Sequence, residues 1–309
     1  MVTTVTLNPC IDWTVELPSI ALGALNLSRS ERIDICGKGV NAAEVLRELG
    51  CPVCCTGISF TENGGLLREK LDALGIPHDF AIARGRIRTN IKAYDLEKNQ
   101  MTELNSLGQP VTSDVLDEFM DKLDALAAKS SIVTLSGRPA NGACGDIYRR
   151  CVKLIGKYPA KTVLDAEGEP LLLALRAKPY LVKPNLYELE TALNAKAGSE
   201  TEIAAMAREL IRLGAGVVCV SMGENGAVIT DGSESFYAPA LPLTPRGFQG
   251  SGDSMVAGIC KAILESRGIG DMLRFGIAAA SASIIREGTL LCRMDDYIKF
   301  LGQVEIRKI

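Results

Sequence analysis

The chain has 309 residues, of which 47% are hydrophobic and 23% are charged, and its formal net charge is −3. These values are ordinary for a globular protein with a sizeable core. They exclude the basic field that draws a protein to nucleic acid or to an anionic membrane surface, so we expect neither partner. An anionic substrate must therefore be bound by a few local Lys and Arg side chains.

No apolar run approaches the roughly 20 residues that span a bilayer, and the N-terminus lacks the basic flank and cleavage pattern of a signal peptide. We therefore expect a cytoplasmic protein whose 10 cysteines stay reduced. The group Cys51-Pro-Val-Cys54-Cys55 has no second cysteine pair at metal-binding spacing, and His78 is the sole histidine of the sequence. We interpret this group as small residues of a buried strand.

Short apolar runs alternate with amphipathic helical patterns along the chain. Each run is typical of a fully buried parallel strand; the runs are 2–7, 53–58, 132–135, 162–164, 180–182 and 217–220. Between them, apolar residues recur on one helical face within 115–126 and 203–211. Repeated β-α units with short connections predict a mainly parallel sheet covered by helices on both faces.

Two stretches, 12–17 and 86–103, alternate polar and apolar residues instead. In the second stretch, Arg88, Asn90 and Lys92 point to one side, and the apolar residues between them point to the other. A strand with one apolar and one polar face belongs to a sheet with one solvated side. We predict a small second sheet, a lid, formed by discontinuous segments at about 11–36 and 86–106 of a single domain that spans 1–309.

A helix marked by apolar residues at 45, 46 and 49 begins at the run Cys36-Gly-Lys-Gly-Val-Asn41. Glycines on both sides of Lys38 permit close approach of the backbone to a small polar ligand, and the ammonium group is available to a phosphate. Asn41 and Glu44 also have the spacing of a capping box, so a simple helix cap is the alternative for Asn41.

The run Arg88-Thr-Asn-Ile-Lys92 places two cations and an amide on one face of the predicted lid strand. This arrangement suits a dianionic phosphate that must be held away from the reacting centre. A solvated strand face with no ligand is the alternative.

A Gly-rich turn, Gln249-Gly-Ser-Gly-Asp253, leads into a helix whose apolar residues recur from 256 to 264. The unpaired backbone N–H groups and the dipole of a helix N-terminus favour an anion. Asp253 lies in the first turn, where a carboxylate is placed to take the proton from an attacking hydroxyl. An aspartate that only offsets the helix dipole is the alternative, and the turn is neither a Walker A loop nor a G-x-G-x-x-G motif.

In their order and spacing, these motifs resemble the PfkB family of ribokinase-like carbohydrate kinases over nearly the whole chain, close to the branch that holds 1-phosphofructokinase and tagatose-6-phosphate kinase. The resemblance is carried by Thr6-Leu-Asn-Pro-Cys-Ile-Asp12, Gly37-Lys-Gly-Val-Asn41, Arg88-Thr-Asn-Ile-Lys92, Leu135-Ser-Gly137, Leu164-Asp-Ala-Glu-Gly168, Lys183-Pro-Asn-Leu-Tyr-Glu188, Ser221-Met-Gly-Glu-Asn-Gly226 and Gly250-Ser-Gly-Asp253.

The resemblance implies a role for each matching position. Asp253 would be the catalytic base, and the amides of Gly250, Ser251 and Gly252 would form the anion hole. Substrate contacts would come from Asp12, Gly37, Gly39 and Asn41 for the sugar and from Lys38, Arg88, Asn90 and Lys92 for its existing phosphate. ATP would lie on Lys183, Ser221, Gly223 and Gly226, and Asn185 and Glu188 would tune Mg²⁺ binding, largely through water.

Three stretches of the sequence depart from the family pattern. Phe248 replaces a threonine that usually precedes the anion hole, and Ser251 replaces an alanine. Arg138 adds a cation near the expected substrate phosphate, where relatives carry Ser. Ser106 and Leu107 stand in for the common Glu-Pro. These departures bear on the identity of the substrate more than on the reaction.

We therefore expect a ribokinase-like three-layer α/β sandwich with a mainly parallel central sheet and a β lid that, by analogy, pairs with a second subunit in a homodimer. The expected activity is phosphorylation of a ketohexose phosphate with ATP and Mg²⁺, with fructose 1-phosphate giving fructose 1,6-bisphosphate. Asp253 would deprotonate the free primary hydroxyl for in-line attack on the γ-phosphorus.

Three alternatives stay open. A sibling kinase would act on tagatose 6-phosphate, fructose 6-phosphate, or an unphosphorylated sugar or nucleoside. A non-catalytic sensor of sugar phosphates or nucleotides is favoured by Phe248 and opposed by Asp253, Asn185 and Glu188. A dehydrogenase is disfavoured because no G-x-G-x-x-G follows the first strand.

Overall fold

The computed structural model describes residues 1–247, 249–287 and 290–309. Phe248, on which the sensor alternative depends, therefore lies outside the described residues. Among those that are described, every helix is too short or too polar to span a bilayer.

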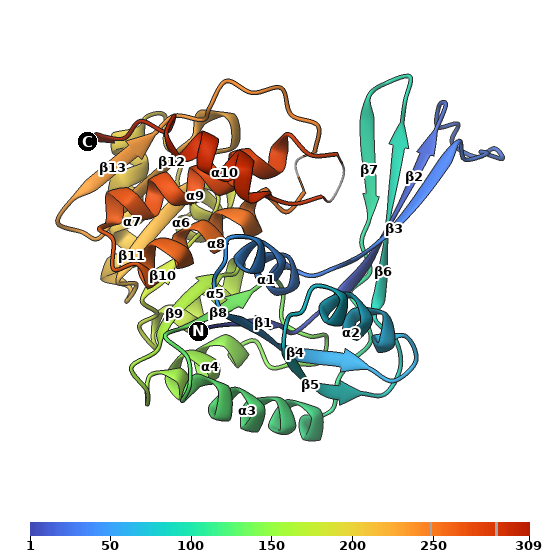
Figure 1. Cartoon of the computed structure of the whole chain (residues 1–309), viewed down its shortest axis with the longest axis horizontal. Helices are drawn as coiled ribbons and strands as arrows, with labels where there is room; N and C mark the ends of the chain where they lie inside the picture. Colours follow the sequence, from blue (N-terminus) through green and yellow to red (C-terminus); the bar gives the residue numbers. More distant parts are fainter. Residues whose placement is uncertain (248, 288–289) are drawn as a thin grey trace.

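The main sheet has ten strands within the described residues and forms the centre of the molecule (Figure 1). Strands β11 to β14 pair antiparallel, and the others pair parallel. In spatial order the strands are β14 (Arg307–Lys308), β13 (Ser235–Ala238), β12 (Ala227–Thr230), β11 (Val217–Ser221), β10 (Leu181–Val182), β9 (Lys161–Asp165), β8 (Ile132–Ser136), β1 (Val2–Thr6), β4 (Val53–Phe60) and β5 (His78–Ala83).

The apolar runs of the sequence form the parallel strands of this sheet, as predicted. Every residue of β1, β4 and β8 is buried, because helices cover both faces of a parallel sheet. Cys54 and Cys55 lie in β4 as free, buried thiols. The strands that end at Thr6, Ser136 and Asp165 are neighbours, so their carboxyl ends form one edge where ligands bind in open α/β sheets.

The helices pack on the two faces of this sheet. In Figure 1, α1, α8, α9 and α10 lie together on one side, and α3 and α4 lie on the other. The described helices are α1 (Lys38–Glu48), α2 (Gly64–Ala73), α3 (Ser113–Ala127), α4 (Ile147–Ile155), α5 (Gly168–Leu175), α6 (Leu186–Leu193), α7 (Glu200–Arg212), α8 (Ser251–Leu264), α9 (Ile269–Ile284) and α10 (Met294–Leu301), with a 3₁₀ turn at Gly223–Asn225. The helical faces expected within 115–126 and 203–211 correspond to α3 and α7.

The predicted small second sheet projects from the main body (Figure 1). Its strand order is β3 (Ser30–Cys36), β2 (Cys10–Leu17), β6 (Arg88–Asp95) and β7 (Gln100–Leu104). Thus two separate chain segments supply its strands, close to the segments expected from sequence.

The two faces of the small sheet reverse the usual pattern of burial. On the polar face, Asn90 and Lys92 are each only 6% exposed. On the apolar face, Trp13 pairs in register with Ile33 and Ile91, and Ile91 pairs with Leu104; Ile33 is 62% and Leu104 is 59% exposed. The solvated side that the alternation predicts is therefore the apolar side, because the polar side covers a cavity at the edge of the main sheet.

Candidate active site

The Gly-rich turn places Asp253 in the first turn of a buried helix, as the sequence predicts. Helix α8 begins at Ser251 after Gly250, whose φ of 73° is left-handed. A Cβ at Gly250 would also collide with the Leu291 side chain, so a glycine is required at this turn. Asp253 is 7% exposed, and its Oδ2 accepts a 2.8 Å hydrogen bond from Asn41 Nδ2.

Burial raises the pKa of Asp253 to about 6, against the opposing effect of the Lys38 charge. The carboxylate form is poorly solvated, so the group holds a proton more readily than an exposed aspartate does. A carboxyl group with a pKa near neutrality is well suited to general base catalysis.

Asn41 does not cap α1, so the capping alternative is wrong. The N-cap of α1 is Gly37, which has no side chain to bond to the helix, and Asn41 lies within the helix. Its side-chain amide instead holds the Asp253 carboxylate, 212 residues away in the sequence. Gly39 has a packing role: a Cβ there would collide with the carbonyl oxygen of Val5 and with Thr6 Oγ1.

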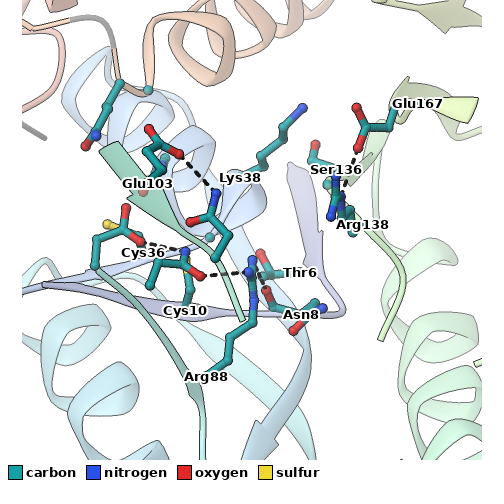
Figure 2. A pocket seen from close by; sticks show the side chains of 18 of the residues that line it. Thr6, Asn8, Cys10, Cys36, Lys38, Arg88, Glu103, Ser136, Arg138 and Glu167 are labelled. Carbon is teal, nitrogen blue, oxygen red and sulfur yellow. Dashed lines mark hydrogen bonds and ion pairs between the residues drawn. The ribbon is translucent and has the colours of Figure 1, made fainter. Parts of the chain in front are cut away.

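A cavity of about 390 Å³ lies between the small sheet and the edge of the main sheet (Figure 2). It brings together many of the predicted substrate residues; those on its wall are Asp12, Gly37, Lys38, Asn41, Arg88, Asn90, Lys92 and Arg138, with Gly250 and Glu188. Gly39, Ser251, Gly252 and Asp253 do not line it, and Asp253 reaches its wall through Asn41. No role was predicted for Asn8, Glu103, Asn105 or Glu167, which also line it.

Three of the four cations on the cavity wall already have a carboxylate partner. Lys92 Nζ lies 2.7 Å from Asp12 Oδ2, and both side chains are less than 9% exposed. Lys38 Nζ lies 3.2 Å from Asp165 Oδ1. Arg138 Nε donates to Glu167 Oε1 at 2.9 Å, at a position where its side chain is 64% exposed.

Arg88 differs from these three cations. Its guanidinium, which lies near Asn8 in Figure 2, donates to Asn90 Oδ1 at 3.0 Å, to the Ser106 carbonyl at 2.9 Å and to the Asn8 carbonyl at 3.4 Å. Within 1–247, 249–287 and 290–309 it forms no ion pair, and its Nε is buried without a hydrogen-bond partner. An uncompensated guanidinium on a cavity wall is a strong site for a phosphate group.

Hydrogen bonds connect Arg88 to Asn90 and Asp12 on the polar face of the small sheet. Asn90 accepts from Arg88 and donates through Nδ2 to Asp12 Oδ1 at 2.9 Å. Asp12 is thereby fixed by both Asn90 and Lys92. Asp12 can then accept hydrogen bonds from a sugar with little reorganisation, since its position is already set.

The predicted nucleotide residues gather at the carboxyl ends of β10 and β11. Lys183 is 4% exposed, and its Nζ lies 3.5 Å from Asp165 Oδ1 and 3.7 Å from the position that a Cβ on Gly252 would take. Asn185 forms a bridge with Ser221. The turn that follows has left-handed glycines at Gly223 and Gly226.

Asn185 and Glu188 form a reciprocal capping box at the start of α6. The Glu188 amide donates to Asn185 Oδ1 at 2.8 Å, and the Asn185 amide donates to Glu188 Oε2 at 2.9 Å. Burial raises the pKa of Glu188. Because one carboxylate oxygen stays outside the box and Glu188 lines the cavity, the oxygen donors of this pair fit Mg²⁺, which prefers such ligands and retains waters.

Asp165 is a further residue of the site for which the sequence predicted no role. It ends β9 and is 1% exposed. Burial raises its pKa, but the nearby charges of Lys183 and Lys38 outweigh that effect, so the net pKa is lowered; Asp165 in turn raises the pKa of Lys38. The available signal was an aspartate directly after a buried apolar run, within the quoted motif Leu164-Asp-Ala-Glu-Gly168.

The structure thus has a buried aspartate at a helix N-terminus and a cavity with four cations on its wall. The chain belongs to the pfkB family of carbohydrate kinases, whose model matches residues 5–296. The 1-phosphofructokinase of Borreliella burgdorferi is 32% identical to it over 100% of this chain and 99% of the relative. The 1-phosphofructokinase of Rhodobacter capsulatus is 35% identical over 90% of this chain and 88% of the relative.

The fold is similar to that of phosphofructokinase-2 from Escherichia coli, in a crystal structure with potassium. The TM-score is 0.91, and the identity is 25% over 98% of both chains. These comparisons confirm the family and the ribokinase-like fold that the motifs predict, and they contradict the dehydrogenase alternative.

Proposed function

We propose that this kinase transfers the γ-phosphoryl group of ATP to a ketohexose phosphate, with fructose 1-phosphate as the acceptor and fructose 1,6-bisphosphate as the product. The proposal of a phosphorylated acceptor depends mainly on the surroundings of Arg88. Its guanidinium has no carboxylate partner in the described part of the chain and lines the same cavity as Gly250 and Asn41, which lead to the base. The relatives named 1-phosphofructokinase support the same choice.

The chemistry follows from the positions of these groups. Asp253 takes the proton of the free primary hydroxyl, whose oxygen bonds to the γ-phosphorus as the bond to ADP breaks. The amides of Gly250, Ser251 and Gly252 face the transferring group at the start of α8, where the helix dipole favours an anion. Lys183 and Lys38 both form ion pairs with Asp165. Their ammonium groups stabilise negative charge on the two sides of the transferring phosphoryl group.

Asn185 and Glu188 would hold Mg²⁺ through water, and Mg²⁺ would supply neutralisation of the phosphate charge of ATP. Closure of the small sheet over the acceptor would exclude water, which competes as an acceptor.

The acceptor is tested by ADP release with ATP and Mg²⁺ on fructose 1-phosphate, tagatose 6-phosphate, fructose 6-phosphate, fructose and a nucleoside. We expect the highest kcat/KM with fructose 1-phosphate, because the relatives are named 1-phosphofructokinase. Arg88 favours any of the phosphorylated sugars over fructose. A higher kcat/KM with tagatose 6-phosphate would change the acceptor but keep the reaction. ATP binding without ADP release on any acceptor would favour the sensor.

The exposed apolar face of the small sheet supports a homodimer that pairs through this face. Trp13, Ile33, Ile91 and Leu104 form one row across all four strands, and such a face is unfavourable in water. The related phosphofructokinase-2 of Escherichia coli has an inhibited form that is tetrameric. Ile33→Asp should convert a dimer to a monomer, as measured by light scattering on a size-exclusion column.

The matched control for this prediction is Ile298→Asp. Ile298 lies on α10 and is 60% exposed, against 62% for Ile33, so the chemical change is the same at a remote surface. A dimer that survives Ile33→Asp, or that is lost equally with Ile298→Asp, contradicts pairing through the small sheet.

A further inference from the structure

Two hydroxyl groups on the cavity wall have no hydrogen-bond partner among the described residues, and neither takes part in the chemistry above. Strand β1 ends at Thr6 and β8 ends at Ser136, and these residues are register partners. Their side chains therefore project from the same face of the sheet. Both line the cavity of Figure 2, and their exposed fractions are only 2% and 3%. Thr6 Oγ1 and Ser136 Oγ are buried without a partner.

Asp165 continues this row on the next strand. It is the register partner of Ser136 on β9. Its Oδ1 faces Lys38 and Lys183, whereas its Oδ2 is buried with no partner in the described part of the chain. Thr6 and Ser136 line the cavity, whereas Asp165 does not. The two hydroxyls lie on neighbouring strands about 4.8 Å apart and form a polar floor of the cavity, with the Asp165 carboxylate beside it.

The chemistry of this polar floor restricts what it binds. Buried polar atoms are nearly always hydrogen-bonded, so a bound group is expected here. A carboxylate oxygen only accepts, whereas Ser and Thr hydroxyls both donate and accept. An ionised phosphate oxygen can only accept, so it cannot donate to either hydroxyl, and a divalent cation is disfavoured because two ammonium groups already lie 3.2 and 3.5 Å from Asp165 Oδ1. An alcohol hydroxyl meets both requirements.

We propose that Thr6 and Ser136, next to Asp165 on the adjoining strand, bind one secondary hydroxyl of the acceptor sugar and thereby select its configuration. The inference rests on the proposed function, because it needs a sugar in this cavity. An epimer that turns this hydroxyl away would leave the Thr6 and Ser136 hydroxyls without a partner and would have a lower kcat/KM. An ordered water offers the same chemistry as a sugar hydroxyl, so the test must separate the two.

The test combines Ser136→Ala and Thr6→Val with the monodeoxy analogues of the acceptor that the wild type uses best. With the full acceptor, each substitution should raise KM about 5- to 10-fold, the loss of one neutral hydrogen bond, with little change in kcat. With the one analogue that lacks the bound hydroxyl, the same substitutions should change KM by less than about 2-fold, because the contact is already absent.

The matched control is Ser59→Ala. Ser59 is also a fully buried serine on a strand of the main sheet with an unpartnered Oγ, but it does not line the cavity, so KM should not change. The unfolding temperature of Ser136→Ala should not fall, because the substitution removes an unpaired buried hydroxyl. A structural role for Ser136 would lower it.

An equal rise in KM for the full acceptor and for every deoxy analogue would overturn the proposal, since a water or a packing change acts on all of them alike. An unchanged KM with the full acceptor would overturn it as well. Wild-type protein that phosphorylates none of the sugars would instead contradict the proposed function, and this inference with it.

Discussion

Replacing Asp253 with Asn is expected to lower kcat by at least about 100-fold, the usual cost of losing a general base, and to leave ATP affinity unchanged. Asn preserves the size of the side chain and a hydrogen bond with Asn41, so the loss reports on proton transfer rather than on structure. The measurement is single-turnover ADP formation together with ATP binding by calorimetry. Asp271→Asn is the control, because Asp271 occupies the first turn of α9 outside the site.

The pH dependence of the wild type gives a second readout of the same group. Because the pKa of Asp253 is raised to about 6 and the base must be ionised, kcat/KM should fall about tenfold per pH unit below that value and level off above it. Ionisation of Asp253 has the opposite effect on folding stability. Ionising Asp253 costs folding stability as the pH rises through about 6, so at pH 8 the Asn variant should be at least as stable as the wild type. Near-normal turnover of this variant removes Asp253 from the mechanism.

Replacing Arg88 with Ala is expected to raise KM for the phosphorylated acceptor about 10- to 100-fold, the range for a lost charge-assisted hydrogen bond. KM for unphosphorylated fructose should stay nearly the same, since fructose offers Arg88 no anion. Arg88→Lys tests geometry against charge, because the single nitrogen of an ammonium cannot occupy both the position of Nη1, which donates to the Ser106 carbonyl, and that of Nη2, which donates to the Asn8 carbonyl.

Arg86→Ala is the matched control for Arg88. Arg86 precedes Arg88 by two residues but is exposed and does not line the cavity. An equal rise in KM for phosphorylated and unphosphorylated acceptors would show that Arg88 supports the sheet rather than a phosphate. Thermal unfolding of both variants checks this point independently.

The strands and helices of the main sheet are predictable because each depends on local sequence. The runs at Val2–Thr6 and Val53–Phe60 are apolar throughout and are buried on both faces. The turn before Asp253 is likewise a local pattern, in which a left-handed Gly250 is followed by a helix. Local motifs also identify part of the cavity wall, including Lys38, Arg88 and Arg138.

The partners of these residues are not predictable from local sequence. Asn41 has the spacing of a cap, yet it bonds to Asp253, 212 residues away. Lys92 was expected on a phosphate, and the structure shows its charge already compensated by Asp12. Such pairs arise only when distant segments meet at the edge of the main sheet. Burial of the polar face of the small sheet has the same cause, since alternation marks two faces but not which one covers a cavity.

Phosphoryl transfer to C6 is tested by identifying the product that forms from fructose 1-phosphate with ATP and Mg²⁺, with phosphorus NMR as the readout. We expect one new phosphomonoester resonance, from a phosphate on the C6 oxygen, to appear in step with ADP. Release of ADP and inorganic phosphate with fructose 1-phosphate unchanged, or no reaction while ATP binds, would contradict it.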